Sequence, residues 1–527
     1  MGDSIKVRTG RVYATGIGEI MNIKQAKNEI KHTVQAYLAK NESGVYKIPA
    51  IRQRPILLMG PPGIGKTQIM EQIAREEKIG LVAYTITHHT RQSAVGLPFI
   101  REEEFDGKTY SVTEYTMSEI IASVHRKIRD SGQQEGILFI DEINCVSETL
   151  APTMLQFLQC KTFGNQTVPE GWIIVAAGNP PEYNKSVRDF DMVTLDRLRY
   201  LTIEADFGVW KEYARAQHLH GAILSYLELR PRNFYRVEAD VDGLQFVTAR
   251  GWEDLSNLMM VYEEMGVPVD ETIVHEFLHH GEVAEDFAAY VDLYRKYQDD
   301  YGVQEILTGR VKADVFARVY AAAFDERLAV TNLLYDGLQH YFIKYSEEKY
   351  ITDHWYEFLK SYRAGIVEVS NPVRYYEELV QKKENEIVAY KEAGFYTRRE
   401  EELQKRLLGK LKEGISELDV SLFTETKDLA ENCFLNAKRG FDVQKIVLEE
   451  TEDAAAKALE YAFDFMEQAF ENGQEMIVFV TELTLGKEAV MFLAEHSCER
   501  YMKYNQELLI GTKKAELLSE LGRDEVK

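Results

Sequence analysis

The segment that most constrains this chain is GPPGIGKT at residues 60–67, which fits the pattern G-x-x-x-x-G-K-[ST]. An apolar run at residues 55–59 precedes it, and a helical pattern follows from Lys66. Glycines allow a tight turn in which consecutive N–H groups point inward, and the N-terminus of the following helix adds its dipole. A strand, loop and helix in this order indicate a site for the phosphates of a nucleotide.

Each residue type in this loop has an expected chemical role. Lys66 would reach the β- and γ-phosphates, and the Thr67 hydroxyl would bind Mg²⁺. A glycine-rich turn that carries Lys-Thr by chance is the alternative, and the strand and helix on either side disfavour it. The residues expected to hold the nucleotide are Gly60, Pro61, Pro62, Gly63, Ile64, Gly65, Lys66, Thr67 and Gln68.

A second apolar segment, ILFIDEIN at residues 137–144, ends in two acidic residues. In a parallel sheet these acids would lie at the carboxyl edge, beside the phosphate loop. Asp141 would hold Mg²⁺ directly or through water, and Glu142 would polarise the attacking water. The alternative is a buried strand that meets an acidic helix cap.

A third segment, WIIVAAGNP at residues 172–180, ends in the polar residue Asn179. An amide at the same sheet edge can orient water and contact the γ-phosphate. The alternative is that Asn179 only starts an Asn-Pro turn.

The first half of the chain alternates short apolar runs with helical patterns. Such alternation predicts an α/β fold with a parallel sheet covered on both faces. The expected strands are residues 55–59, 80–86, 136–140 and 172–177, and clear helical patterns cover residues 67–77 and 117–130.

Proline marks a change in character. Eleven of the twelve prolines lie at or before Pro268, and a long stretch with a single proline and apolar residues at helical spacing is typical of helices. We therefore expect four parts: a basic lead-in with one helix near 21–41 (1–44), an α/β core (45–205), a small helical lid (206–300) and a long helical extension (301–527).

Charge argues against some classes of partner. The 62 basic and 86 acidic side chains give a formal net charge of −24 over 527 residues. Proteins that coat nucleic acid or anionic membranes need a basic surface, so neither is an expected partner. Residues 1–54 differ, because they hold ten basic and four acidic residues.

The four cysteines are widely spaced, which suggests neither a disulfide framework nor a zinc knuckle. The first residues lack the apolar segment of a signal peptide, and no apolar run approaches the roughly 18 residues of a membrane span. We therefore expect a soluble cytoplasmic protein.

The three strand ends, in this order, resemble the AAA+ ATPases, where they are called Walker A, Walker B and sensor 1. The MoxR and dynein-related branch is more similar still, because residues 179–204 resemble its segment from sensor 1 to the arginine finger. In that branch an Asn-Pro-x-Glu-Tyr stretch leads to Leu-Asp-Arg-Phe, and here Leu198 replaces the final aromatic residue. The resemblance implies that Arg197 is the finger, with Arg199 and Arg188 as alternates.

The resemblance covers about residues 45–300 and implies a function. Such proteins bind ATP and Mg²⁺ between subunits of a ring, commonly a hexamer, and act on protein clients in a chaperone-like way. Their partner often bears a von Willebrand A metal-binding domain. A finger supplied by a neighbouring subunit stabilises charge on the transferred phosphoryl group and is worth about 10³–10⁵ in rate.

Three further stretches fit the same branch. Residues 246–259 resemble the sensor 2 helix, where Thr248 would cap the helix and Arg250 would face the nucleotide, although Ala249 replaces the family's proline. Residues 97–116, with an Asp-Gly turn, and residues 161–172 resemble hairpins that face the ring pore. Their aromatic side chains would either touch clients or pack locally, and they are Phe105, Tyr110, Tyr115 and Phe163.

One motif favours a different class. HEFLH at 275–279 matches H-E-x-x-H, in which His275 and His279 on one helix face would bind zinc and Glu276 would act as general base of a metalloprotease. The motif lies inside the segment that the lid needs, and His280-Gly281 is typical of a helix end. A lid helix with three histidines in its last turns is the simpler interpretation.

Two other rivals stay open. A nucleic-acid-linked GTPase or motor would use the same phosphate loop, and the basic N-terminal segment keeps it in consideration. A scaffold that binds ATP only for assembly is disfavoured by Glu142.

Overall fold

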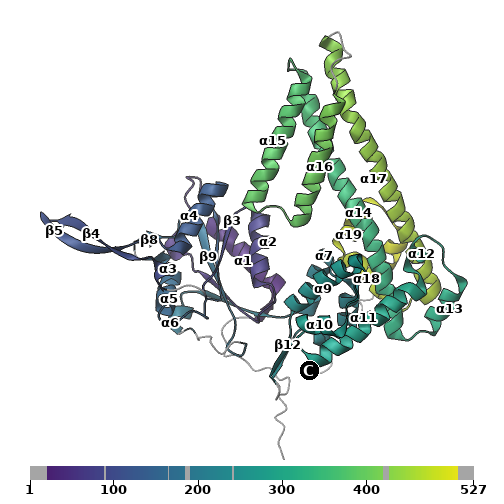
Figure 1. The fold of residues 1–527 in the computed structure, drawn as a ribbon, viewed down its shortest axis with the longest axis horizontal. Helices are drawn as coiled ribbons and strands as arrows, with labels where there is room; N and C mark the ends of the chain where they lie inside the picture. The colour runs from purple at the N-terminus through teal and green to yellow at the C-terminus, as the bar shows by residue number, and fades with distance from the viewer. Residues whose placement is uncertain are drawn as a thin grey trace, which may run out of the picture. The chain divides into compact units, whose positions relative to one another are not determined.

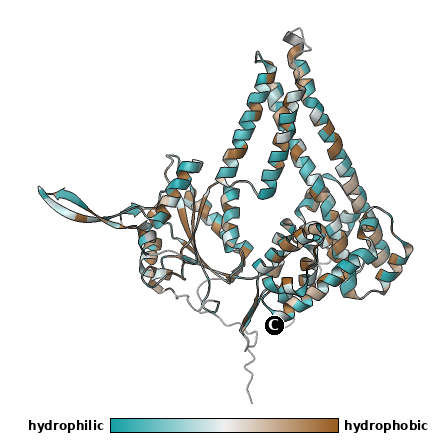
Figure 2. Cartoon of the chain, in the orientation of Figure 1, coloured by the Kyte–Doolittle hydropathy of each residue, from teal (hydrophilic) through white to brown (hydrophobic). Residues whose placement is uncertain are grey.

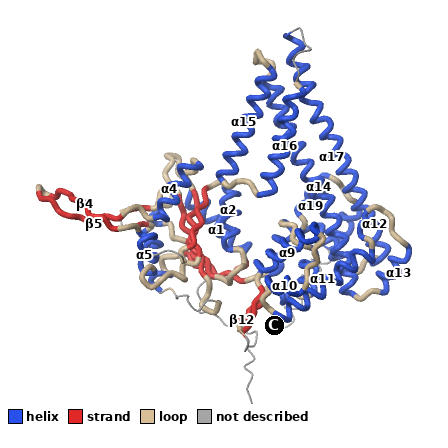
Figure 3. The backbone as a smooth tube through the Cα atoms, in the orientation of Figure 1, coloured by secondary structure: helices blue, strands red, loops and turns tan. Residues whose placement is uncertain are grey.

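The structure is a computed structural model that describes residues 20–87, 91–163, 165–183, 190, 192–239, 243–418 and 426–508. The chain divides into two compact units. The first unit is Met1–Val209 with Glu392–Phe395, and the second unit is Trp210–Lys391 with Tyr396–Lys527. Figure 3 shows that the large sheet belongs to the first unit and that helices make up most of the second. The further division into lid and extension remains a prediction.

The first unit is built on a six-stranded sheet with the order β1-β10-β2-β9-β6-β3, in which every pair of neighbours is parallel. Two of these strands, β3 and β9, are labelled in Figure 1. The strands are β1 (Ile20–Asn22), β2 (Ile56–Met59), β3 (Gly80–Thr85), β6 (Gly136–Asp141), β9 (Trp172–Gly178) and β10 (Arg199–Glu204). The four strands expected from the apolar runs are therefore confirmed, and β1 and β10 complete the sheet.

Both faces of this sheet are covered. On one face Leu57, Leu138 and Ile174 pack with residues of the helices α4 and α5. The alternate residues of the same strands, such as Leu58 and Phe139, are also buried, and α2 contacts β3 and β6. Figure 2 shows these strands as the brown centre of the unit. The helices are α1 (Ile23–Leu38), α2 (Lys66–Glu77), α3 (Arg91–Val95), α4 (Glu119–Ser131), α5 (Ala151–Cys160) and α6 (Met192–Leu195).

Local chemistry explains how the helices next to the sheet begin. The side chain of Asn22 accepts a hydrogen bond from the Gln25 N–H while the Gln25 side chain accepts one from the Asn22 N–H, so α1 begins with a capping box. Helix α2 begins at Lys66 because Gly65, with φ of +95°, ends the phosphate loop in the left-handed region.

Two antiparallel hairpins interrupt the α/β order. The longer joins β4 (Pro98–Phe105) to β5 (Lys108–Tyr115), and the shorter joins β7 (Thr162–Phe163) to β8 (Gln166–Thr167). Asp106 and Gly107 have φ of +51° and +74°, as a two-residue hairpin turn of the Asp-Gly kind requires. The predicted turn is confirmed.

The second unit is mostly helical, as the sequence predicted for residues after 300. Its only named strands among the described residues are the antiparallel pair β11 (Arg236–Ala239) and β12 (Leu244–Val247). Its helices up to residue 321 are α7 (Phe207–Ala216, which begins in the first unit), α8 (Gly221–Leu229), α9 (Ala249–Met265), α10 (Glu271–Phe277), α11 (Gly281–Tyr301), α12 (Val303–Leu307) and α13 (Ala313–Ala321).

Long helices follow. They are α14 (Phe324–Gly365), α15 (Pro372–Ala393), α16 (Arg398–Glu417), α17 (Thr426–Phe470), α18 (Gln474–Leu485) and α19 (Lys487–Glu495). Buried residues of α14 to α17, among them Trp355, Tyr376, Leu407 and Ala437, form one hydrophobic cluster. These helices therefore share a core and are not solitary rods (Figure 1).

A buried ionic network ties α7 to the long helices. Arg215 on α7 is 2% exposed, and it pairs with Asp336 of α14 at 2.9 Å and with Glu482 of α18 at 2.7 Å. Its guanidinium also lies 4.7 Å from the centre of the Tyr335 ring. Removal of one partner would leave an uncompensated charge inside the unit, so the network fixes how these helices pack.

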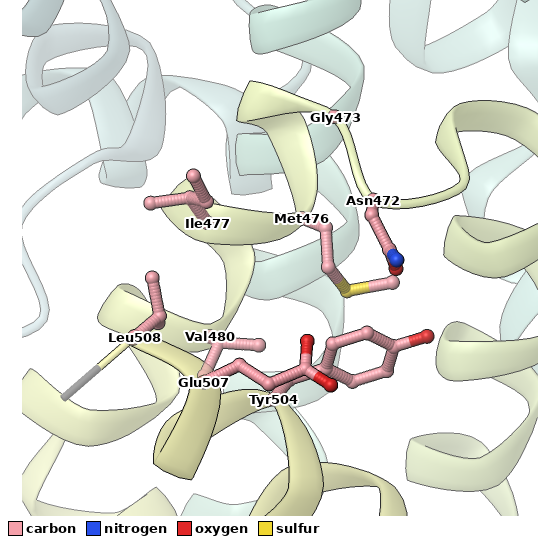
Figure 4. A pocket seen from close by; sticks show the side chains of 8 residues that line it. All are labelled: Asn472, Gly473, Met476, Ile477, Val480, Tyr504, Glu507 and Leu508. Atoms are coloured by element: carbon pink, nitrogen blue, oxygen red, sulfur yellow. The ribbon is translucent and has the colours of Figure 1, made fainter. Parts of the chain in front are cut away.

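Figure 4 shows a pocket of about 150 Å³ in the second unit, where the side chains of Met476 and Tyr504 face each other. Its lining is largely apolar, with Glu507 as its one carboxylate. The lining residues are Asn472, Gly473, Met476, Ile477, Val480, Tyr504, Glu507 and Leu508. This composition offers no group of residues suited to phosphate chemistry.

Candidate active site

Three neighbouring strands bring the expected site residues to one edge of the sheet. Strand β2 leads into the phosphate loop, β9 ends beside Asn179, and β6 ends at Asp141. Because β2, β9 and β6 are adjacent and parallel, their carboxyl ends meet at the same edge. The sheet order therefore places the three sequence motifs together.

The three glycines of the phosphate loop are required for two different physical reasons. Gly63 and Gly65 have φ of +72° and +95°, a region that side chains with a Cβ rarely enter. At Gly60 there is no room for a side chain, because a Cβ there would lie 2.8 Å from the backbone oxygen of Ile203. The loop thus keeps its backbone close to the sheet and free of side chains on that side.

Lys66 is 8% exposed, and its ammonium group lies among oxygen atoms. Its Nζ donates to the backbone oxygens of Gly60 and Pro61 and to Oδ1 of Asn179, each at 2.8 Å. A lysine ammonium has three donors. Lys66 therefore joins the loop to the end of β9 from inside the site.

Thr67 and the acidic pair lie next to each other. The Thr67 hydroxyl donates to Oδ2 of Asp141 at 3.1 Å, and the backbone N–H of Glu142 donates to Oδ1 of the same carboxylate at 2.9 Å. A hydroxyl and a carboxylate are oxygen ligands of the kind that Mg²⁺ prefers, so these two residues fit the ion. Glu142 has φ of +57°, an unusual conformation for a residue with a side chain.

The remaining loop residues shape the site rather than supply charge. Ile64 is buried, while Pro62 and Gln68 are half-buried. A Cβ on Gly65 would lie 3.2 Å from Oε1 of Gln68, so the Gln68 side chain turns back toward the loop.

Sequence reasoning missed one residue of this edge. Asn144 is 2% exposed, and its Nδ2 donates to the backbone oxygen of Asn179 at 2.8 Å. The available signal was an amide two residues after Glu142, between Ile143 and Cys145. That signal is weak, because only the pairing of β6 with β9 brings Asn144 to Asn179.

Comparison with protein families decides the class of this site. Residues 56–193 match the model of the ATPase family associated with various cellular activities (AAA). The chain contains an AAA ATPase domain. Hydrolysis of ATP is accordingly its enzymatic activity, and the matched segment spans all three strand ends described above. No protein of the curated collection matches the chain.

The arginines near the end of the AAA domain differ in their environment. Arg197 is exposed, follows α6, and donates a hydrogen bond to Gln159 of α5. Arg199 instead pairs with Glu29 and Thr33 of α1, which commits it to a contact within its own subunit. Arg188 lies outside the described residues.

Arg250 belongs to the second unit, where it occupies the first turn of α9 and is exposed. The Thr248 hydroxyl accepts a hydrogen bond from the Gly251 N–H at 3.2 Å, as expected for the cap of this helix. The predicted cap is confirmed, and the role of Arg250 toward nucleotide stays a prediction.

The hairpin aromatics of the AAA domain fall into two groups. On the β4–β5 hairpin Phe105, Tyr110 and Tyr115 are 50%, 51% and 37% exposed. Phe163 is 2% exposed, and its ring stacks on Phe157 with 4.1 Å between centroids. Of the two alternatives for Phe163, contact with a client or local packing, the structure supports local packing, because the residue is part of the core.

The H-E-x-x-H stretch does not form the expected helical face. Helix α10 ends at Phe277, and His279 lies beyond it, where its backbone oxygen accepts from the Phe246 N–H at 2.9 Å. Among the described residues, no group of three or more His, Cys, Asp or Glu side chains is arranged to hold a metal ion. The structure therefore gives the metalloprotease interpretation no geometric support.

The interpretation of His280-Gly281 as a helix end is also wrong. His280 is 4% exposed and precedes α11, which begins at Gly281, so this dipeptide starts a helix. Of the three histidines, only His275 lies in the last turn of α10.

No helix in the described part of the chain is both long and apolar enough to cross a membrane.

Proposed function

We propose that this AAA domain works as a MoxR-like ATPase, which binds Mg-ATP between the subunits of a ring, a hexamer by family resemblance, and remodels a protein partner. Two observations carry the proposal. Contacts join Lys66 to Asn179 and Thr67 to Asp141 at the sheet edge, and Arg197 is exposed and hydrogen-bonds Gln159. A site that needs an arginine from elsewhere suits assembly into a ring.

Within each subunit the residues divide the work. Lys66 would bind the β- and γ-phosphates, and its contact with Asn179 would place the amide beside the γ-phosphate. Glu142 would polarise the attacking water, a role for which a carboxylate at the edge of the site is suited. Thr67 and Asp141 would hold Mg²⁺, which when bound neutralises charge on the phosphate oxygens.

The neighbouring subunit would contribute Arg197. A guanidinium matches phosphoryl oxygens in shape and charge, and its exposure leaves it able to reach another molecule. Arg250 would contact nucleotide from α9, so that hydrolysis changes the contacts of both arginines and moves domains about a hinge.

The β4–β5 hairpin would contact the client. Both of its strands are largely exposed, and Phe105, Tyr110 and Tyr115 offer apolar area that is otherwise costly to leave in water. The client could carry a von Willebrand A domain, as partners of this branch often do.

The experiment uses the Glu142→Gln variant of the full chain, which should bind ATP and no longer hydrolyse it. With ATP it should sediment as a ring and retain a client through ATP-dependent capture. Double replacement of Phe105 and Tyr110 by Ala should release that client without dissolving the ring. Glu148→Gln, a change of the same kind at an exposed position, is the matched control.

Three results would contradict the proposal. A Glu142→Gln variant with undiminished hydrolysis would refute the site assignment. A monomer that hydrolyses ATP at the full rate would refute the shared site. Turnover that rises only with DNA or RNA, or a preference for GTP, would favour the nucleic-acid motor instead.

A further inference from the structure

The buried amide of Asn144 links the segment that carries Glu142 to Asn179, which contacts Lys66. Asn144 lies two residues after Glu142 and is 2% exposed. Its Nδ2 donates to the backbone oxygen of Asn179 at 2.8 Å, while the Asn179 side chain accepts from Lys66 at the same distance. Asn179 is thus held through its main chain by one residue and through its side chain by another.

The fit around Asn144 is close. A Cβ on Gly178 would lie 2.5 Å from Oδ1 and 2.8 Å from Cγ of Asn144, so glycine at this position makes room for the amide. Oδ1 has no hydrogen-bond partner in the part of the chain that the structure describes. An apolar side chain of similar shape would avoid this cost, because a buried polar atom without a partner is unfavourable.

The turn that carries Glu142 is anchored on both sides. Before it, the Glu142 N–H donates to the Asp141 carboxylate at 2.9 Å. After it, the Ile143 N–H donates to the backbone oxygen of Ala177 at 2.9 Å, and Ala177 directly follows the last β9 residue that pairs with β6. Asn144 adds the next contact to β9. The left-handed conformation of Glu142, with φ of +57°, is held by these anchors.

We infer that Asn144 is a positioning residue for ATP hydrolysis: through Asn179 it fixes the spacing between Glu142 and the Lys66 ammonium. This inference rests on the proposed roles of Glu142 and Asn179. Hydrolysis requires the water and the γ-phosphate in near-attack geometry, and a displacement of about 1 Å can cost about 10²-fold in rate. Binding of nucleotide depends on the phosphate loop, whereas the hydrogen bond of the Asn144 side chain goes to the backbone of Asn179.

The test compares steady-state ATPase kinetics, affinity for a fluorescent ATP analogue and thermal stability of the full chain. Asn144→Ala should lower kcat between about tenfold and 10²-fold while the affinity changes by less than about threefold. If that variant does not fold, Asn144→Asp takes its place, since it keeps the shape and removes the donor. A wild-type kcat in either folded variant overturns the inference.

A matched control separates positioning from mere stability. Asn332, on α14 in the second unit, is also fully buried, donates through Nδ2 to Ser225 and Glu228, and has an Oδ1 without a partner among the described residues. Asn332→Ala should lower the melting temperature and leave kcat of the folded protein unchanged. An equal loss of kcat in both variants shows that Asn144 acts only through stability and overturns the inference.

A double-mutant cycle with Asn179→Ala gives the second readout. If Asn144 acts through Asn179, the double variant should lose little more activity than the Asn179 variant alone. Losses that multiply show independent roles and overturn the inference. Full hydrolysis by the Glu142→Gln variant would refute the proposed site itself. An inactive Glu142→Gln variant together with a fully active Asn144→Ala variant would refute only the role of Asn144.

Discussion

Nζ of Lys66 lies 2.8 Å from Oδ1 of Asn179, so the phosphate loop and the end of the adjacent strand share one hydrogen bond. The contact is between a cation and a neutral amide. The hydrogen bond therefore holds the Lys66 ammonium beside Asn179 without placing a negative charge from Asn179 next to it.

This relationship predicts the effect of a charge at position 179. Asn179→Asp would turn the hydrogen bond into an ion pair and place a negative charge beside the phosphates. The affinity for ATP should fall by about tenfold or more, since an ion pair competes with the nucleotide for Lys66. Titration with a fluorescent ATP analogue measures this. Asn165→Asp adds the same charge at an exposed turn, and an equal loss there would show that the total charge matters.

The backbone of Glu142 predicts a trade between stability and activity. With φ of +57°, Glu142 carries strain of about 1 kcal/mol that glycine would not. Glu142→Gly should therefore be as stable as the native protein or more stable by up to about 1 kcal/mol, and it should not hydrolyse ATP. Denaturant unfolding and phosphate release measure the two effects. Glu142→Gln, which keeps the strain, is the control, and a glycine variant less stable than it would argue against stored strain.

The exposed Arg197 predicts complementation between inactive subunits. Arg197→Ala and Glu142→Gln should each lose about 10³-fold or more in kcat, following the size of finger and base effects. A mixture of the two variants should regain activity, because some sites then combine an intact Glu142 with an intact Arg197. Phosphate release against mixing ratio measures the recovery.

Arg199 supplies the control for that experiment. Arg199 pairs with Glu29 and Thr33 of its own subunit, so Arg199→Ala should lose stability, and mixing should give no recovery. Mixtures of the Arg197 and Glu142 variants that stay inactive would count against a finger supplied by the neighbour.

A half-buried lysine predicts a pH-dependent stability. Burial lowers the pKa of Lys161 from 10.5 to about 8, and its Nζ contacts the amide oxygen of Gln53 at 3.3 Å. Between about pH 8 and 10.5 the unfolded chain binds more protons at this residue than the folded one, so the free energy of unfolding should rise with pH there. Lys161→Met should remove this rise and stabilise the protein at pH 7 by roughly 1–3 kcal/mol.

Urea unfolding between pH 7 and 10 checks this prediction. Lys47→Met removes an exposed lysine of the same unit and should change the free energy of unfolding by less than about 0.5 kcal/mol. An unchanged pH profile in Lys161→Met would show that Lys161 is not the source of the slope.

Features set by neighbouring residues in the chain could be predicted from the sequence. The apolar runs became β2, β3, β6 and β9, and Asp106-Gly107 became the hairpin turn, since strand formation and turn chemistry depend mainly on local composition. The edge that collects Lys66, Asp141 and Asn179 followed from parallel strands whose carboxyl ends carry polar residues.

Features that depend on residues distant in the chain could not be predicted from the sequence. Phe163 is buried because Phe157 stacks on it, and no local pattern separates it from exposed Phe105. Asn144 reaches Asn179 only because of the register in which β6 pairs with β9. The histidines at 279 and 280 fall outside α10 because that helix ends at Phe277, and the backbone of His279 pairs instead with Phe246.

The β4–β5 hairpin has a further consequence for how copies of this protein meet. Within the described parts of the chain it is a ribbon of two strands, so each strand has one edge that could pair with a strand of another molecule. Its three consecutive glutamates, Glu102, Glu103 and Glu104, put negative charge along one edge strand, so two such strands would repel each other at neutral pH. The ribbon is thereby protected against aggregation with its own kind, and the same charge leaves it able to accept a strand that carries basic residues.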